Sequence, residues 1–183
     1  MTKKEEIIQT AAILFTKRGY YGVGLKELLD QCNVPKGSFY YYFPKGKIDL
    51  LKQVLDYCYE RMINGIRKNY FNKETVLECF EAMADGLAEH LNDSNHFVSL
   101  TLSMIGIESV YLDEEIHEKC KEIYTSWQQM YSDLFIEHGY SIKEAQMKAQ
   151  SIFSLIHGSL ISSWIKSDNT DLYLVKKALK DFL

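Results

Sequence analysis

Proline is scarce in this chain, since only Pro35 and Pro44 occur among its 183 residues. The long stretch after Pro44 therefore contains no residue that breaks a helix as strongly as proline does. The sequence also lacks any apolar run near the roughly 18 residues that a helix needs to cross a bilayer. We therefore expect a mainly helical protein without a transmembrane segment.

Cysteine is present but scattered, with no C-x-x-C pair among Cys32, Cys58, Cys79 and Cys120. This spacing predicts reduced thiols rather than a disulfide framework. Charged side chains stand in the first turn of the N-terminal segment, which reads MTKKEEIIQTAAILF and lacks the uninterrupted apolar core of a signal peptide. These features predict a cytoplasmic protein.

Charge is distributed unevenly along the chain, although the net charge is only −4. Residues 1–52 contain nine Lys and Arg against five acidic residues, whereas residues 53–183 contain twelve against twenty. A basic N-terminal part joined to an acidic remainder indicates a module that binds a polyanion.

Apolar residues recur at helical spacing through most of the chain. The pattern predicts about nine helices, at 3–18, 25–32, 35–42, 47–68, 73–91, 97–111, 114–138, 143–166 and 171–182. The second and third are short and are separated by a turn of three or four residues, which is the outline of a helix-turn-helix.

Residues 35–47, PKGSFYYYFPKGK, combine basic, small and aromatic residues around the third predicted helix. Free N–H groups at a helix N-terminus attract phosphate, and phenol groups can reach phosphate or a base edge. Phe39, Tyr42 and Phe43 are better suited to packing. The remaining side chains predict DNA contacts from Lys36, Gly37, Ser38, Tyr40, Tyr41 and Lys47.

The stretch from Ile7 to Leu51 resembles the DNA-binding domain of TetR-family transcriptional regulators. The resemblance rests on four motifs in order: Leu14-Phe15-x-x-x-Gly19-Tyr20, Leu25-x-x-Leu28-Leu29, Asn33 to Phe43, and Lys47-x-x-Leu50-Leu51. The connection from Pro44 to Lys47 is similar to that of the LmrA/YxaF-like subgroup. One departure is Val23-Gly24, which replaces the family's usual pair of hydroxyl residues. The hydroxyl that commonly caps the second helix and touches phosphate is therefore missing, although the Gly24 backbone N–H can do part of that work.

This resemblance implies an all-α repressor that binds a palindromic operator in double-stranded DNA as a homodimer and is released by a small hydrophobic effector. It implies a helix-turn-helix domain at 1–47 and a helical ligand-binding and dimerisation domain at 48–183. The six residues predicted above match the family's usual DNA-contact positions.

Apolar and aromatic residues are plentiful in the second domain, and the resemblance implies a ligand cavity between its helices. Such residues also serve simply to pack a helical bundle. The candidates for the pocket are Phe97, Leu100, Met104, Trp127, Met130, Phe153 and His157. The last two helices are expected to form a two-fold interface from Leu155, Leu160, Ile161, Leu172, Leu174, Val175, Leu179 and Phe182.

Three alternatives compete with a DNA-binding regulator. No G-x-S-x-G, phosphate-binding glycine loop or H-E-x-x-H occurs, so we expect no enzyme and no cofactor. Glu114, His117 and Cys120 stand at one-turn spacing and suggest half a metal site, although a solvated charged face explains them more simply. A thiol redox sensor is the third alternative, and nothing near the cysteines indicates a lowered pKa.

Overall fold

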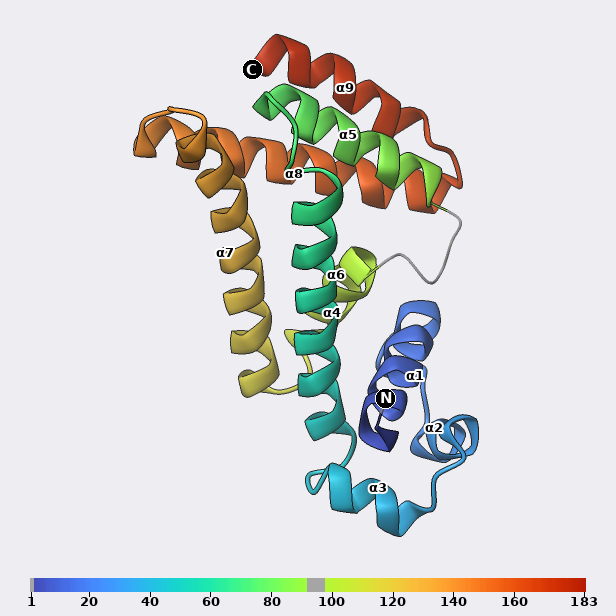
Figure 1. The fold of residues 1–183 in the computed structure, drawn as a ribbon. Helices are drawn as coiled ribbons and strands as arrows, with labels where there is room; N and C mark the ends of the chain where they lie inside the picture. Colours follow the sequence, from blue (N-terminus) through green and yellow to red (C-terminus); the bar gives the residue numbers. More distant parts are fainter. Residues whose placement is uncertain (1, 92–97) are drawn as a thin grey trace. The chain divides into compact units, whose positions relative to one another are not determined.

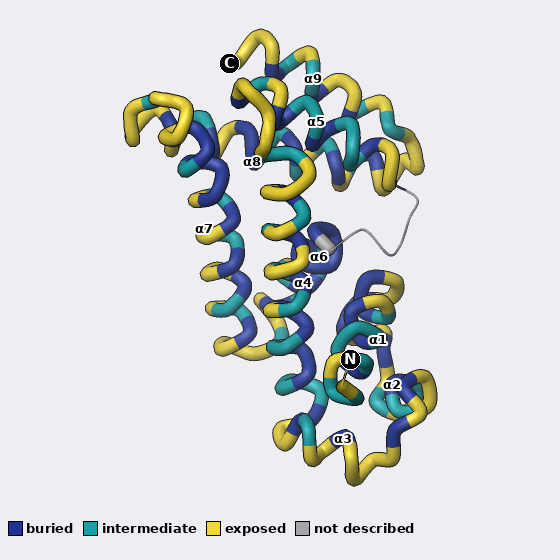
Figure 2. The backbone as a smooth tube through the Cα atoms, in the orientation of Figure 1, coloured by how far each residue is buried: buried dark blue, intermediate teal, exposed yellow. Residues whose placement is uncertain are grey.

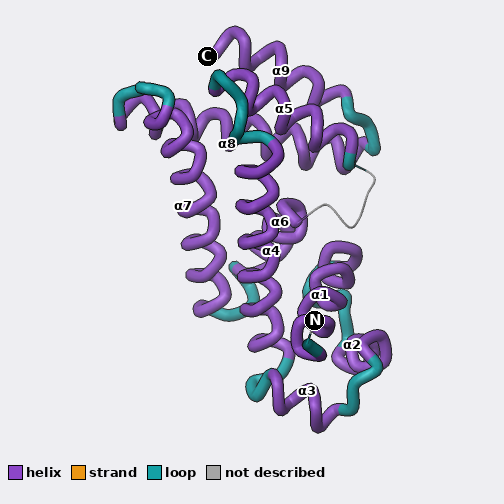
Figure 3. The backbone as a smooth tube through the Cα atoms, in the orientation of Figure 1, coloured by secondary structure: helices purple, strands orange, loops and turns teal. Residues whose placement is uncertain are grey.

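The computed structural model describes residues 2–91 and 98–183. Its described residues form nine helices and no strand (Figures 1 and 3), which confirms the all-α prediction. The helices are α1 (Lys3–Arg18), α2 (Leu25–Cys32), α3 (Lys36–Tyr42), α4 (Lys47–Asn69), α5 (Val76–Glu89), α6 (Val98–Ser109), α7 (Glu114–Glu137), α8 (Ile142–Lys166) and α9 (Thr170–Phe182).

Capping boxes fix the first residues of three helices. At α1, the Thr2 side chain accepts a hydrogen bond from the Glu5 N–H, and the Glu5 carboxylate accepts one from the Thr2 N–H at 2.7 Å. The same arrangement starts α5 at Thr75 and α8 at Ser141. Each such cap contributes about 1 kcal/mol. The predicted fifth helix begins at residue 73, and the cap at Thr75 explains why α5 begins three residues later.

The chain divides into two compact units, and the division falls within α4 and α7. Unit 1 comprises the described residues of Met1–Met62 and Ser94–Glu122, and unit 2 those of Ile63–Asp93 and Ile123–Leu183. The predicted domain boundary after residue 47 remains a prediction.

Unit 1 has a core built from the apolar faces of α1, α2, α3 and α4 (Figure 2). Phe15 of α1, Leu28 of α2 and Phe39 of α3 are fully buried. Burying a side chain of this size stabilises the fold by about 1.5–3 kcal/mol. This core therefore holds the two short helices, α2 and α3, in place.

Unit 2 has an aromatic core. The rings of Phe80 and Tyr131 lie 5.0 Å apart between centroids, and the Tyr131 hydroxyl donates to the Met83 sulfur at 3.5 Å. The Tyr70 phenol packs against Gly86, and a side chain at residue 86 would force this ring to move.

The last helix packs on both α5 and α8 within unit 2. This packing corrects part of the predicted two-fold interface. The following residues face the interior of the unit and cannot supply a surface for a second chain: Leu160, Leu172, Val175 and Leu179.

Among the described residues, no helix combines the length and the apolar character that are needed to span a membrane.

Candidate nucleic-acid interface and ligand site

A tight turn joins α2 to α3. Asn33 adopts the left-handed conformation, with φ 48° and ψ 55°, which asparagine tolerates better than most residues. The Val34 N–H then donates to the Leu29 carbonyl at 3.0 Å, and Pro35 stands immediately before the first turn of α3. The predicted helix-turn-helix is therefore present.

Two buried phenylalanines anchor α3. Phe39 and Phe43 are both fully buried, with ring centroids 5.1 Å apart. Because they occupy one side of this seven-residue helix, its other side faces outward (Figure 2). Five of the six predicted DNA-contact residues are exposed along α3: Lys36, Gly37, Ser38, Tyr40 and Tyr41.

Tyr41 is the most exposed aromatic residue of α3, at 81%. Tyr40 is less exposed because its ring lies beside Gly46, whose φ of +74° closes the turn after α3. Tyr42 is half-buried, consistent with the packing role predicted for it. At Gly37, an added Cβ would meet no described atom within 4 Å outside its own helix. The fold of unit 1 therefore does not itself demand glycine at this position.

Lys47, the sixth predicted contact, is placed differently. Its ammonium donates to the Tyr20 carbonyl and lies 3.8 Å from the centroid of the Tyr20 ring. Burial lowers the pKa of Lys47, and the nearby Glu108 carboxylate opposes this shift. A phosphate contact from Lys47 remains a prediction, but this lysine also has partners inside unit 1, which the sequence motif did not indicate.

Gly24 is the N-cap of α2 and has no side chain to accept from the free N–H groups of the first turn. Val23 beside it is buried in unit 1. The hydroxyl pair expected from the family is therefore replaced by one packing residue and one bare backbone position.

An aromatic cluster in unit 2 brings together three of the predicted ligand residues. Trp127 lies 5.2 Å from Phe153 and 4.3 Å from His157 between ring centroids, and Phe153 and His157 stack at 3.9 Å. Tyr124 completes the cluster, at 5.8 Å from Trp127. Tyr124 was missed by the sequence analysis, although its spacing of three from Trp127 places both on one face of a helix.

His157 has two differently placed ring nitrogens. Its Nδ1 lies 2.8 Å from the Phe153 carbonyl, which assigns the proton to Nδ1 and leaves Nε2 as an acceptor. The Nε2 atom is buried, and no described group hydrogen bonds to it. Burial lowers the pKa of His157 to about 4, against the smaller effect of the Phe153 carbonyl. The cluster is therefore a buried apolar environment that contains one neutral hydrogen-bond acceptor.

The other predicted ligand residues belong to different parts of the chain. Met130 is buried on α7 in unit 2. Leu100 and Met104 belong to α6 in unit 1, where Leu100 is buried and Met104 half-buried. Phe97 lies outside the described residues.

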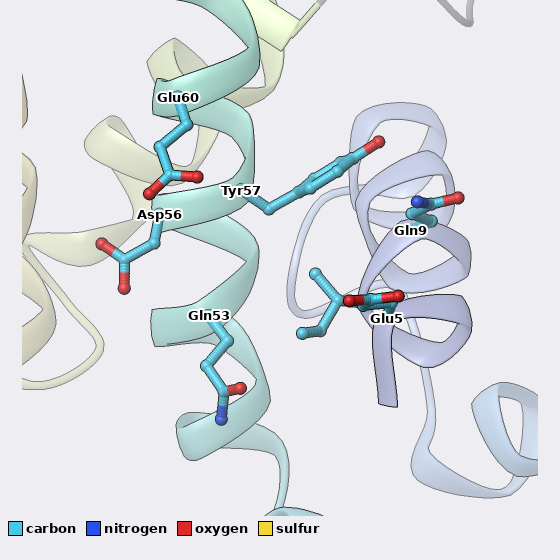
Figure 4. Close-up of a pocket in the computed structure, with 7 residues that line it drawn as sticks. Glu5, Gln9, Gln53, Asp56, Tyr57 and Glu60 are labelled. Carbon is cyan, nitrogen blue, oxygen red and sulfur yellow. The ribbon is translucent and has the colours of Figure 1, made fainter. Parts of the chain in front are cut away.

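A cavity of about 480 Å³ lies in unit 1 between α1 and α4 (Figure 4). Tyr57 extends from α4 toward α1, where Glu5 and Gln9 stand. None of the predicted DNA or ligand residues lines this cavity, and its carboxylates oppose binding of a phosphate backbone. Its lining residues are Glu5, Ile8, Gln9, Gln53, Asp56, Tyr57 and Glu60.

The described residues give no support to the metal or redox alternatives. His117 uses its Nδ1 in a 3.0 Å hydrogen bond with the Ser109 hydroxyl, and no three metal-ligating side chains of the described part converge. Burial raises the pKa of all four thiols, that of Cys58 to about 12. A raised pKa disfavours the thiolate that a redox sensor needs.

Helix α3 is short and exposed, is fixed to the core by buried side chains, and follows α2 after a tight turn. This arrangement is that of a helix-turn-helix DNA-binding protein. The chain belongs to the TetR family of bacterial transcriptional regulators, within its LmrA/YxaF-like group. The pattern of "Bacterial regulatory proteins, tetR family" matches residues 7–54. That of "Transcriptional regulator LmrA/YxaF-like, C-terminal domain" matches residues 76–178, more than half of the chain. The resemblance noted in the sequence is therefore confirmed.

Individual relatives agree with this assignment. The HTH-type transcriptional regulator YxaF of Bacillus subtilis is 24% identical over 96% of this chain and 92% of its own length. The HTH-type transcriptional regulator LmrA of the same organism is 25% identical over 98% of this chain and 96% of its own. These relatives are regulators and not enzymes, as expected for this chain.

Solved structures match the whole architecture. A TetR transcriptional regulator from Legionella pneumophila has a TM-score of 0.84 at 20% identity and covers 100% of this chain and 98% of its own. Reduced NemR of E. coli has a TM-score of 0.83 at 21% identity, covering 99% and 96%. At such identities the likeness establishes the fold alone.

Proposed function

We propose that this protein is a repressor that binds a palindromic operator as a homodimer and is released by a small hydrophobic ligand. The outward face of α3 carries this proposal. The exposed residues of α3 supply a lysine, a hydroxyl and two phenols, and the buried Phe39 and Phe43 fix this helix to the core. In the dimer, two copies of α3 enter successive major grooves about one helical turn apart.

The exposed residues of α3 have different roles in this proposal, because some provide affinity and others recognise the DNA sequence. Lys36 neutralises phosphate and makes binding salt-dependent. Tyr41, the most exposed of the tyrosines of α3, reaches a base edge or a phosphate with its hydroxyl. Gly37 allows the DNA backbone to approach α3 closely, since no Cβ stands between them.

Dimerisation is supported by an exposed stripe along α8. Its members recur at intervals of three and four residues, opposite the buried face of the helix. Small residues occupy the middle of the stripe and larger apolar residues its two ends, which favours close approach of a second helix. We define the α8 stripe as Met147, Ser151, Ser154, Gly158, Ile161 and Ile165.

The ligand in this proposal binds at the aromatic cluster of unit 2. Tyr124, Trp127, Phe153 and His157 provide apolar rings, and the neutral Nε2 of His157 accepts a hydrogen bond. This chemistry selects an uncharged, largely apolar molecule that has at least one donor. Release of DNA requires that the molecule bind the DNA-free state more tightly than the DNA-bound state.

The experiment begins by selecting duplexes from a random pool with the wild-type protein, which identifies the operator directly. Fluorescence anisotropy then compares Tyr41→Phe with the control Tyr111→Phe, a tyrosine of unit 1 with 82% exposure, close to that of Tyr41. We expect Tyr41→Phe to weaken operator binding about tenfold, as for loss of one hydrogen bond to a charged or buried partner. Enrichment of no palindrome, or equal effects of both substitutions, would reject the proposal.

The ligand half of the proposal is tested separately with a panel of uncharged hydrophobic compounds. A compound that dissociates the operator complex should also quench Trp127 fluorescence in a Trp164→Phe protein, where Trp127 is the remaining tryptophan. His157→Leu should raise the concentration of that compound needed for release. Release without any effect on Trp127 would place the ligand elsewhere.

A further inference from the structure

Two oppositely charged side chains bind the backbone of Tyr20, in the turn between α1 and α2. The Tyr20 N–H donates to Oε2 of Glu108 at 2.8 Å. The Tyr20 carbonyl accepts from the ammonium of Lys47. Glu108 comes from α6 and Lys47 from the start of α4. Two helices that are distant in the sequence therefore bind the N–H and the carbonyl of the same turn residue.

The second oxygen of Glu108 fits against Gly19. Gly19 has φ +68°, and a Cβ built on it would lie 2.5 Å from Oε1 of Glu108. The carboxylate therefore occupies space that is open because residue 19 has no side chain. One oxygen binds the Tyr20 N–H while the other lies over the glycine, and this fixes the orientation of the carboxylate.

Two neighbouring contacts join α6 and the segment after it to the same part of unit 1. The Thr16 hydroxyl donates to the Ala12 carbonyl at 2.8 Å, so it accepts the hydrogen bond that it shares with the Thr101 hydroxyl. The Tyr21 hydroxyl donates to the Tyr111 carbonyl at 3.1 Å. Glu108 lies between Thr101 and Tyr111 in the sequence, and among these three contacts from α6 and its following segment it is the charged one.

The negative charge of Glu108 allows an electrostatic effect on DNA binding to be separated from a structural one. A carboxylate in a DNA-binding unit repels phosphate, so electrostatics alone predicts tighter DNA binding when the carboxylate is removed. We propose that Glu108 is a positioning residue for operator recognition. It fixes the turn that precedes α2 and α3, and so holds α3 in the orientation that is needed to contact the operator bases. This inference rests on the DNA-binding function of α3 but concerns a residue that does not touch DNA.

The test compares Glu108→Gln and Glu108→Ala with Glu115→Gln. Glu115 is an exposed residue of the same unit, pairs with Lys52 and does not touch the turn, so its substitution makes the same charge change. Anisotropy gives the affinity for the selected operator and for a scrambled duplex of equal length, and circular dichroism gives Tm. The ratio of the two affinities reports positioning, because a change in net charge alone affects both DNAs alike.

We expect Glu108→Ala to lower operator affinity at least tenfold without lowering affinity for the scrambled duplex. Glu108→Gln should lie between, since its amide oxygen can still accept from the Tyr20 N–H. Glu115→Gln should raise both affinities slightly and leave their ratio unchanged. If the alanine variant does not fold, the near-isosteric glutamine variant decides the question.

Operator binding by Glu108→Gln as tight as that by Glu115→Gln, with the same ratio, would overturn the inference. Such a result would leave the DNA-binding proposal intact. Failure of the wild-type protein to prefer any operator would instead reject both.

Discussion

The ammonium of Lys47 lies over the ring of Tyr20 and donates a hydrogen bond to the carbonyl of the same residue. Lys36, in contrast, is exposed on α3, with its ammonium 6.0 Å from the centroid of the Tyr40 ring. The sequence motif assigned both lysines to DNA phosphate. Their different surroundings predict that Lys36 acts on DNA alone, whereas Lys47 also holds unit 1 together.

Substitution of the two lysines should therefore have different effects. Lys36→Ala should leave Tm unchanged and reduce the slope of log affinity against log salt by about 0.9 for each phosphate that is no longer neutralised. Lys47→Ala should also lower the free energy of unfolding, by about 1–3 kcal/mol, because the Tyr20 carbonyl loses its partner. Salt titrations and urea denaturation of both variants make this comparison. Equal free energies of unfolding in the two variants would show that Lys47 has no role within the unit.

Gly37 provides a test that separates folding from recognition. Gly37→Ala places a methyl group where the described fold is open, so it should not destabilise the protein and should stabilise α3 by up to about 1 kcal/mol. If DNA approaches this backbone closely, the same methyl group costs about 1–3 kcal/mol in the complex, which corresponds to a loss of roughly fivefold to a hundredfold in operator affinity. Thermal unfolding and anisotropy measure the two effects.

The matched control for Gly37 is Gly65→Ala. Gly65 lies within α4 and likewise has open space around an added Cβ among the described residues. The Gly65→Ala variant should be more stable than wild type and should keep the operator affinity of wild type. Unchanged affinity in Gly37→Ala would mean that DNA does not pass close to the start of α3.

The helices could be predicted closely because their signals are local. Periodic apolar residues, Gly19, Asn33 and Pro44 set the ends of α1, α2 and α3 within a residue. The late start of α5 depends on the reciprocal hydrogen bonds between Thr75 and Glu78, a local signal that apolar periodicity alone does not reveal.

What could not be predicted depends on contacts between distant segments. Nothing near Lys47 in the sequence indicates Tyr20, and nothing near Glu108 indicates Gly19. The prediction for the buried side of α9 was also wrong, since the apolar residues of an amphipathic helix do not reveal whether they meet their own chain or a second one. Leu172 and Leu179 pack inside unit 2, whereas Leu174 is exposed.

His157 should make stability depend on pH between about 6.5 and 4. Its pKa is lowered to about 4 by burial, so in this range the unfolded chain binds a proton that the folded chain does not. The contribution is therefore fully present above pH 6.5 and is lost as pH falls to about 4. It amounts to roughly 3 kcal/mol, at 1.36 kcal/mol for each pH unit.

Urea denaturation across this range, in wild type and in His157→Gln, isolates the contribution as the difference between two curves. The control is His138→Gln, since the Nδ1 of His138 also lies 2.8 Å from the carbonyl four residues earlier but its side chain is exposed. The pH dependence that comes from His157 should persist in His138→Gln. A parallel curve for His157→Gln would contradict burial of a neutral imidazole.

The α8 stripe leads to a prediction about assembly and DNA binding together. Ile165→Arg places a charge at one end of the stripe, where the side chain is 76% exposed, so the folded chain should tolerate it. In a dimer that buries this stripe, two unpaired arginines would face an apolar surface and cost several kcal/mol. We therefore expect light scattering to show a monomer at micromolar concentration. Operator affinity should fall by at least tenfold, because the two copies of α3 are no longer linked.

The control for the α8 stripe is Ile142→Arg, because Ile142 is 65% exposed on the same helix but lies off the stripe. This variant should stay dimeric and keep its operator affinity, since its arginine remains in water in both the monomer and the dimer. If both variants stay dimeric, the two-fold contact must use a different surface. Dissociation of both would mean that a charge anywhere on α8 weakens the dimer, so the stripe would have no special part in assembly.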